Sequence, residues 1–351
     1  MQALPSVSVI VPNFMHAAYL EARLASIACQ SYQDFEVIML DDASTDGSLA
    51  ILESWATKDE RFRLVRNEVN SGSTFKQWNK GAELARGKFL WIAESDDVAE
   101  PDLLKDLVEV LLDQPEVVIA YAQSLLIDDK GKALHSFDVH YQYLFKSNRW
   151  HQAHSNRGLD EIEQYFMLHN VVPNASGALL RAATYHSIGG ADPTWKLNGD
   201  YMFYVRMLER GDIAYLPQTL NHFRLHDQTQ RQKANVTGHV YQELLAIADY
   251  IAQTHQPPEA IKRKAYRNIA TWWTHSLYRQ SWAKSERKMN LQVNAKLFSR
   301  FLKIYPLVLF HIPYEGLVRL LVRALEITGL KQPLRHVLHQ VFPNRFMPRA
   351  T

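Results

Sequence analysis

Short apolar runs that alternate with helical segments constrain the fold of this chain more than any other feature. The clearest runs are Val7–Val11, Phe35–Leu40 and Lys88–Ala93, and a segment with helical spacing follows each of them. Hydrophobicity within the runs is continuous rather than alternating, so we predict strands that are covered on both faces. Strands that alternate with helices in this way indicate a mostly parallel α/β sheet flanked by helices.

The regular alternation ends after Tyr121. We expect His135–Asn156 to form an irregular loop, because the segment is polar and aromatic with no clear period. From about residue 236 onward the pattern is helical throughout. We therefore predict two parts, an α/β domain at residues 1–230 and a helical, basic C-terminal region at residues 231–351.

Composition excludes several classes of protein. The 351 residues are 47% hydrophobic and 22% charged, a balance typical of globular rather than disordered chains. The single cysteine, Cys29, excludes a disulfide scaffold and suits a reducing compartment. No secretory signal is predicted, and Ile304–Val318 is too short and too often interrupted for a transmembrane helix. We therefore expect a cytoplasmic protein.

Charge is distributed unevenly along the chain. Residues 281–351 contain 12 Lys/Arg and 3 Asp/Glu, a net charge of +9, which leaves 27 and 34, or −7, for the first 280 residues. Within this tail, Leu317–Leu330 has the pattern of an amphipathic helix with a partly basic face. The tail either docks on the anionic inner face of the plasma membrane or packs against the α/β domain or a second copy. We expect no nucleic-acid partner, because only this tail would favour one.

Polar and acidic residues follow the predicted strands directly. Pro12-Asn13-Phe14 follows the first run, Asp41-Asp42 the second, and Glu94-Ser95-Asp96-Asp97 the Lys88–Ala93 run. These segments converge, since the carboxyl ends of parallel strands share one edge of the sheet. Clustered carboxylates either cap helices and face solvent or hold a hard cation such as Mg²⁺ or Mn²⁺, and spacing alone leaves both interpretations open. The chain has no glycine-rich dinucleotide or P-loop motif, so a phosphate bound here would depend on the cation.

The sequence as a whole resembles the family 2 inverting glycosyltransferases. The resemblance covers roughly residues 6–230 and implies the GT-A fold, a Rossmann-like, mostly parallel sheet that binds a nucleotide-diphospho-sugar. The matching motifs occur in the family's order and read VSVIVPNF, LDDASTDGS, NKGAELARGKFLWIAESDD, VVPNASGALLR and LNGDYMFYVRMLERGDIAYLPQTLNHFRLH.

The resemblance also implies roles for individual residues. Asp200 matches the catalytic base, and Asp96 and His226 match positions that contact the divalent metal, Mn²⁺ or Mg²⁺. Two residues depart from the family pattern: Glu94 replaces the first Asp of the DxD motif, and Gly199 precedes Asp200 where an acid is common. For Lys76, simple solvent exposure remains an alternative, and for Phe14, core packing. The positions that match nucleotide or donor binding are Pro12, Asn13, Phe14, Asp41, Lys76, Asn79, Glu94, Ser95, Asp97 and Arg224.

These observations lead us to expect an inverting, metal-dependent transfer of a sugar to a hydroxyl of a glycan or lipid-linked acceptor, in bacterial surface polysaccharide synthesis. The QxxRW signature of processive synthases is absent, which favours the addition of one sugar or a few. Two alternatives remain. A sugar nucleotidyltransferase would usually carry a glycine-rich, basic N-terminal loop. A non-catalytic sugar-nucleotide or glycan-binding module would not need the acids at positions 94, 96, 97 and 200.

Overall fold

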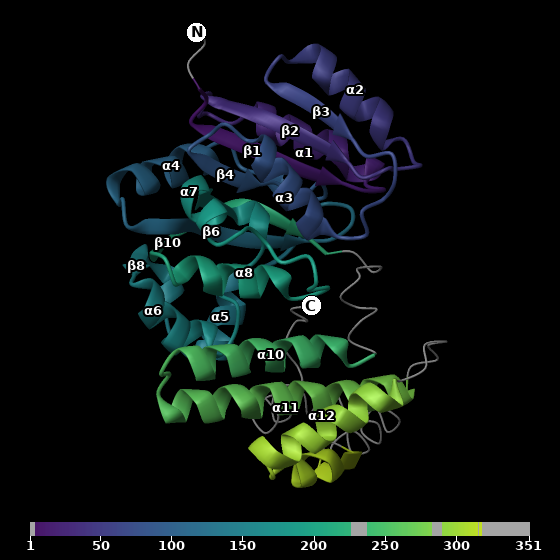
Figure 1. Ribbon diagram of the computed structural model, residues 1–351, viewed down its shortest axis with the longest axis vertical. Coiled ribbons are helices and arrows are strands. Elements are labelled where there is room, and N and C mark those ends of the chain that lie inside the picture. Colours follow the sequence, from purple (N-terminus) through teal and green to yellow (C-terminus); the bar gives the residue numbers. More distant parts are fainter. Residues whose placement is uncertain (1–3, 226–236, 283–289, 315, 318–351) are drawn as a thin grey trace, which may run out of the picture. The chain divides into compact units, whose positions relative to one another are not determined.

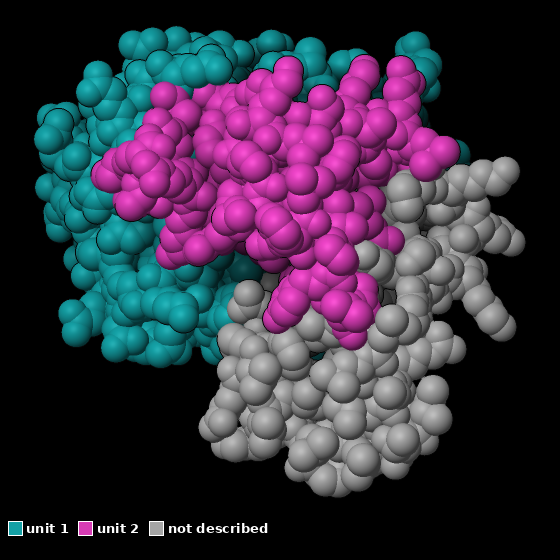
Figure 2. All heavy atoms as spheres, turned by 90° about the horizontal axis from the view of Figure 1, so that it is seen from below, with its two compact units in different colours: residues 1–227, 253–257 teal, residues 228–252, 258–351 magenta. Residues whose placement is uncertain are grey.

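The computed structural model describes residues 4–225, 237–282, 290–314, 316 and 317 (Figure 1). The chain divides into two compact units, which Figure 2 colours separately. Unit 1 comprises Met1–Asp227 with Gln253–Pro257, and unit 2 comprises Gln228–Ala252 with Pro258–Thr351.

Unit 1 is built on a sheet of ten strands in its described part. Eight of them follow the order β3-β2-β1-β4-β9-β6-β10-β5, while β7 pairs with β6 and β8 pairs with β10. The strands are β1 (Val7–Asn13), β2 (Phe35–Asp41), β3 (Phe62–Arg66), β4 (Phe89–Ile92), β5 (Val98–Ala99), β6 (Val117–Ile127), β7 (Ala133–Ser136), β8 (His154–Asn156), β9 (Ala178–Arg181) and β10 (Asp212–Arg224).

Most of the central pairings are parallel. Strands β3, β2, β1 and β4 run parallel to one another, and so do β6 and β10. Strand β9 joins the two halves and is antiparallel to both β4 and β6. The predicted mostly parallel sheet is therefore confirmed.

Helices cover both faces of this sheet and make up most of the described part of unit 2. In unit 1 they are α1 (Ala17–Ala28), α2 (Ser48–Lys58), α3 (Thr74–Leu84), α4 (Leu103–Asp113), α5 (Phe137–Phe145), α6 (Gly158–Glu161), α7 (Ala182–Ser187) and α8 (Gly199–Leu208), with 3-10 turns η1 (Arg149–His151) and η3 (Ala175–Gly177) and a π-helical turn η2 (Ile162–Phe166). The helical C-terminal part contains α10 (His239–Thr254), α11 (Glu259–Trp282) and α12 (Leu291–Ile304).

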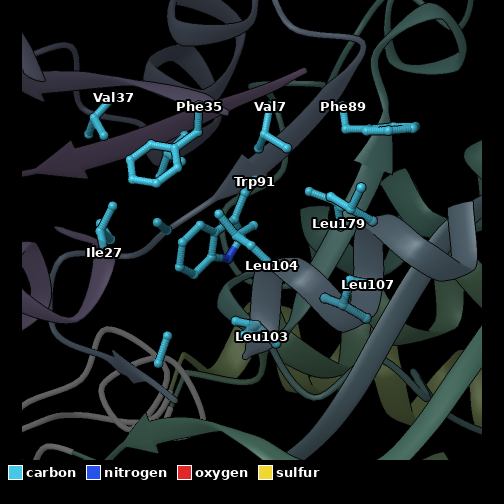
Figure 3. Close-up of a cluster of buried hydrophobic side chains, with 14 of the residues drawn as sticks. Val7, Ile27, Phe35, Val37, Phe89, Trp91, Leu103, Leu104, Leu107 and Leu179 are labelled. Atoms are coloured by element: carbon cyan, nitrogen blue, oxygen red, sulfur yellow. The ribbon is translucent and has the colours of Figure 1, made fainter. Parts of the chain in front are cut away.

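The core explains why the strands carry continuous apolar runs. Val7, Val9 and Val11 alternate along β1 and join a fully buried cluster with residues of α1 and α4. Trp91 lies near the centre of this cluster (Figure 3). On the opposite face of β1, Ile10 lies so close to Gly81 of α3 that a Cβ atom there would come within 2.3 Å of the Ile10 Cγ2 atom. Both faces of β1 are thus covered, as the sequence pattern predicts.

Two predictions in the second half of unit 1 are wrong or incomplete. His135–Asn156 is not an irregular loop, because it contains α5, η1 and β8. Its order comes from aromatic packing: Tyr141 and Trp150 are buried, and their rings stack with centroids 4.6 Å apart. Strand β10 was not predicted, since its register shifts against β6 between Leu216 and Asn221 break any simple pattern.

Within the described ranges, no helix combines the length and hydropathy needed to span a bilayer. Most of the predicted amphipathic segment Leu317–Leu330 lies outside the described residues.

Candidate active site

The ends of β1 and β2 form the first part of the site. Asn13 and Asp41 are register partners, and Asn13 Nδ2 donates a hydrogen bond to Asp41 Oδ1 at 3.0 Å. Asp41 also accepts the backbone N–H of Ser44 at 3.1 Å. Both side chains are buried, and so is Pro12 in β1, whereas Phe14 is 46% exposed. Phe14 is therefore not a core residue, and its ring is accessible beside a buried polar pair.

Asp42 organises the segment that follows β3. Its carboxylate accepts hydrogen bonds from Asn67 Nδ2 at 2.6 Å, the Ser71 backbone N–H at 2.8 Å and Gln77 Nε2 at 3.0 Å. Lys76, on the first turn of α3, is exposed and donates from Nζ to the Ser71 carbonyl oxygen at 3.1 Å. The buried Asp42 thus fixes the loop that precedes Lys76.

Helix α3 holds the turn at residues 190–191, which precedes Asp200 in the chain. Asn79 Nδ2 donates to the Ala191 carbonyl oxygen at 2.7 Å, and Asn79 Oδ1 accepts from the Tyr185 hydroxyl at 2.6 Å and from the Ala191 N–H at 2.9 Å. Its amide is therefore engaged within the protein and holds the turn at residues 190–191. One residue earlier, Trp78 Nε1 donates to Glu94 Oε1 at 2.8 Å.

The acidic segment after β4 is held from several sides. The Glu94 backbone N–H donates to Ser176 Oγ at 3.0 Å, and Ser95 Oγ lies 2.8 Å from His16 Nδ1. Asp97 is 1% exposed. Its Oδ2 accepts from Asn174 Nδ2 at 2.5 Å and its Oδ1 from the Arg224 N–H at 2.9 Å.

Burial makes ionisation of this segment unfavourable. Desolvation, with repulsion from Asp96, raises the pKa of Glu94 from 4.5 to about 8. The same two causes raise the pKa of Asp97 to about 7. A local positive charge would relieve both effects, which is the electrostatic condition that a cation-binding site meets.

The carboxylate oxygens here fit a metal ion that takes only some of its ligands from the protein. No group of three or more His, Cys, Asp or Glu side chains within residues 4–225, 237–282, 290–314 and 316–317 is placed to hold a metal ion. Mg²⁺ and Mn²⁺, however, are commonly bound by one or two carboxylates together with substrate phosphates. Asp97 is almost fully buried, whereas Asp96 is only partly buried, so Asp96 is the better candidate ligand.

Asp200 lies in the first turn of α8. Its side chain is partly buried, and Asn170 Nδ2 lies 3.4 Å from its Oδ2 atom. The N-terminus of a helix favours a negative charge, so the position suits an ionised carboxylate. The buried Tyr204 lies within the electrostatic influence of both Asp200 and Glu94, because burial and the charges of these two acids all raise its pKa.

Packing explains why glycine precedes Asp200. A Cβ atom at Gly199 would lie 2.4 Å from Phe75 Cε2 and 2.8 Å from Trp195 Cβ. Real Cβ contacts are not that short, so the acid that is common at this position in the family would not fit against α3 here.

Arg224, at the end of β10, braces the acidic segment. Its Nε donates to the Asp96 carbonyl oxygen at 2.7 Å, and Nη1 donates to the carbonyl oxygen of Asp128 at 3.0 Å. The guanidinium also lies over the ring of Tyr19, with its central carbon 5.0 Å from the ring centroid. His226, the other basic residue predicted here, lies outside the described residues.

Sequence reasoning missed the residues that hold these groups in place. Trp78 and Ser176 contact Glu94, Asn174 contacts Asp97, and Asn170 contacts Asp200. Asn174 and Ser176 lie within the VVPNASGALLR motif, so that run carried a signal for them. Nothing in the sequence marks Trp78 as a partner of Glu94, because the contact is tertiary.

Solved structures share this architecture and define the class of the fold. S. aureus TarS residues 1–349 in complex with UDP-GlcNAc aligns with a TM-score of 0.61 at 20% identity, covering 88% of this chain and 89% of that one. The mannosyltransferase PcManGT of Pyrobaculum calidifontis, in complex with GDP-Man and Mn²⁺, aligns with a TM-score of 0.56 at 16% identity, covering 90% and 85%. The fold of this protein is GT-A.

Sequence comparison relates part of the chain to a family. Residues 8–170 match the family model described as Glycosyl transferase family 2. The putative teichuronic acid biosynthesis glycosyltransferase TuaG of Bacillus subtilis is 35% identical over 133 residues, which cover 38% of this chain and 52% of TuaG. The match thus spans about half the length of this relative. Residues 8–170 are therefore similar to glycosyltransferase family 2.

Proposed function

We propose that this protein is an inverting, metal-dependent glycosyltransferase that uses a nucleotide-diphospho-sugar donor. One observation carries the proposal: the segment from Asn170 to Ser176 contacts both Asp200 and the acidic segment after β4. Asn170 lies against Asp200, while Asn174 and Ser176 hold Asp97 and Glu94. A single short segment of the chain therefore links the candidate base to the candidate donor site.

Asp200 acts as the general base in this proposal. Ionised at the start of α8, it removes the proton from an acceptor hydroxyl as the hydroxyl oxygen attacks the anomeric carbon of the donor. The bond to the diphosphate breaks as the new glycosidic bond forms, so one displacement inverts the anomeric configuration. Asn170 orients the carboxylate through its amide.

The strand ends hold the donor. The exposed ring of Phe14 can stack on the nucleobase of the donor, beside Pro12, Asn13 and the carboxylate of Asp41. Lys76 is exposed, so its ammonium group can bind a phosphate of the donor. Asn79, Ser95 and Arg224 support the site through the contacts described above.

The metal site is assigned to Asp96, with Glu94 and Asp97 as supporting carboxylates and His226 as a further candidate. A bound Mg²⁺ or Mn²⁺ would stabilise the negative charge that develops on the departing diphosphate. The TarS structure holds UDP-GlcNAc, and the PcManGT structure holds GDP-Man with Mn²⁺, which supports a donor of this class.

The proposal is tested first by ligand-dependent thermal stability. UDP, GDP, dTDP and CMP are each added with and without Mn²⁺, because a ligand that binds only the native state raises the melting temperature. We expect one nucleotide to stabilise the protein, and Mn²⁺ to enlarge that shift. A folded protein that responds to none of them would contradict the donor site and favour a non-catalytic module.

We further propose that the acceptor is a glycan or lipid-linked sugar and that the protein works at the cytoplasmic face of a membrane. The name of the TuaG relative, which refers to teichuronic acid biosynthesis, supports a surface polysaccharide. In unit 2, Leu307, Phe310, Tyr314 and Leu317 are 54%, 70%, 52% and 66% exposed. Their spacing places them on one side of a helix, and the exposed Lys296 and Lys303 of α12 supply positive charge nearby in the sequence. This combination suits an anionic lipid surface.

A further inference from the structure

Arg23 is a charged residue inside the apolar core of unit 1. It lies on the same face of α1 as Leu20, Leu24 and Ile27, and all four are 0% exposed. Its guanidinium carbon is 4.8 Å from the centroid of the Trp91 ring, the indole at the centre of the cluster in Figure 3. None of its three side-chain nitrogens has a hydrogen-bond partner among the described residues. An unpaired charge in such a place is strongly destabilising unless nearby charges compensate for it.

The charges of the acidic segment after β4 supply that compensation. Helix α1 and the residues just after it pack against the chain that follows β4: Ser26 Oγ accepts the Ala99 N–H at 3.3 Å, and Gln30 Oε1 accepts the Leu104 N–H at 2.9 Å. Arg23 lies one turn before Ser26 on the same face, and so faces the residues that precede Ala99. Burial lowers the pKa of Arg23 to about 10 while the charges of Asp97, Asp96 and Glu94 raise it, so the guanidinium stays protonated.

We infer that Arg23 is a fixed counter-charge that weakens the binding of a free divalent cation to the acidic segment and strengthens the binding of the nucleotide diphosphate. This inference rests on the proposed donor site. Within the described part of the chain Arg23 makes no hydrogen bond to the carboxylates, so it offsets their charge through space without occupying the oxygens that a metal would need. The site is then tuned to accept cation and diphosphate together rather than the cation alone.

Trp91 connects Arg23 with the acidic segment through its own contacts. Its indole Nε1 donates to the Ser176 carbonyl oxygen at 2.8 Å, and Ser176 Oγ accepts from the Glu94 N–H. The same ring thus contacts the Arg23 guanidinium and donates a hydrogen bond to the residue that holds Glu94. Arg23 is not a catalytic residue, since it acts on the bound ligands only through its charge.

The test compares Arg23→Met with Arg23→Lys in the full chain. Mg²⁺ alone and UDP alone are titrated calorimetrically at about pH 8.5, where protons compete least with the metal. GDP replaces UDP if wild type does not bind UDP. A unit charge at this range changes the affinity for a divalent ion by about five- to thirtyfold. We expect Arg23→Met to bind Mg²⁺ that much more tightly and UDP at least about threefold more weakly, while Arg23→Lys stays close to wild type.

Opposite changes in the affinities for Mg²⁺ and for UDP distinguish a charge effect from damage to the fold, which would weaken both. Arg61→Met is the matched control, because Arg61 also stacks on a core ring, Phe35, at 4.4 Å but pairs with Asp59 at the other end of the sheet. It should change neither affinity. Unchanged affinities in Arg23→Met, or a fall in both that lysine does not rescue, would overturn the inference.

Two further outcomes separate the possible failures. If Arg23→Met does not fold, Arg23→Gln takes its place, and failure of both neutral variants to fold while Arg23→Lys folds would make Arg23 a structural residue only. If wild type binds neither Mg²⁺ nor a nucleotide, the proposed donor site itself fails before any variant is compared.

Discussion

Asp200 and Glu94 are two carboxylates of one site in opposite environments. Asp200 stands at the start of α8, where the helix favours its negative charge. Glu94 lies where burial and a neighbouring acid raise its pKa to about 8. When the environments of two acids differ in this way, they are suited to different tasks. Asp200 suits proton abstraction, and Glu94 suits a place beside a cation.

Replacement of the base should affect chemistry and spare binding. We expect Asp200→Asn to lower kcat by about 10²- to 10⁴-fold, because the amide cannot accept the acceptor's proton. The affinity for the donor nucleotide, measured by thermal shift, should remain within about twofold. The exposed Asp113→Asn at the end of α4 serves as the control. A parallel loss of nucleotide binding in Asp200→Asn would assign Asp200 to the fold instead.

The raised pKa of Glu94 predicts how stability depends on pH. Between its ordinary pKa of 4.5 and its folded pKa of about 8, the folded protein holds a proton that the unfolded chain has lost. Stability therefore falls as pH rises through this window. We expect Tm to fall by roughly 3–6 °C between about pH 5 and pH 8.5, and Mg²⁺ to restore part of the loss at the upper end.

Glu94→Gln isolates this contribution. The amide oxygen can still accept the Trp78 N–H, but the side chain no longer ionises, so the fall in Tm across the same window should be shallower. The exposed Glu109→Gln on α4 should leave the slope unchanged. A slope in Glu94→Gln as steep as that of wild type would place the pH dependence on other groups.

At the scale of elements, the sequence predicted most strands and helices of the α/β unit, but it did not predict α5 or β10 in the second half. The strands β1, β2 and β4 are covered on both faces, so their apolar runs are continuous and easily recognised. The helix α5 is held by aromatic rings and histidines that show no hydrophobic period, and its packing against Trp150 is tertiary. For β10, the register shifts remove the alternation on which strand prediction depends.

The same distinction applies to the site. The positions of Asp41, the acidic segment and Asp200 follow from strand ends and a helix start, which are local features of the sequence. The contacts of Arg23, Trp78 and Asn170 join segments far apart in the chain. No local pattern encodes such contacts, so only the folded structure reveals them.

The close approach of α8 and α3 at Gly199 gives a prediction for these elements. Gly199→Ala would force its Cβ atom into Phe75 and Trp195 and displace the first turn of α8. We expect a loss of about 1–3 kcal/mol in the free energy of unfolding together with a lower kcat. In Gly47→Ala the new Cβ would meet only Ala17 Cβ at 3.8 Å, so the cost should stay below about 1 kcal/mol. Equal effects of both substitutions would contradict the packing argument.

For the whole molecule, the separation of charge and the exposed apolar stripe predict membrane binding. The double substitution Leu307→Ser and Phe310→Ser removes two large apolar side chains, each worth about 1.5–3 kcal/mol when fully buried. We expect at least about tenfold weaker co-sedimentation with vesicles that contain phosphatidylglycerol, and weaker binding of wild type as salt increases.

Two comparisons make this result decisive. Leu112→Ser alters another exposed leucine, 61% exposed on α4 of the α/β unit, and should not affect vesicle binding. Vesicles of phosphatidylcholine alone should bind wild type weakly, because they lack negative charge. If the double variant binds as wild type does, or if wild type does not bind anionic vesicles, the C-terminal region has another partner.

Strand β9 lies between β4 and β6 and hydrogen-bonds to both, yet it is made after them. During synthesis the ribosome therefore releases one half-sheet, β3-β2-β1-β4, and later the start of the other, each with an unsatisfied edge. These edges remain open until Arg181 emerges, and open edges invite pairing with other chains. A nascent chain that stalls between Ile92 and Ala178 is thus the form of this protein most in need of a chaperone.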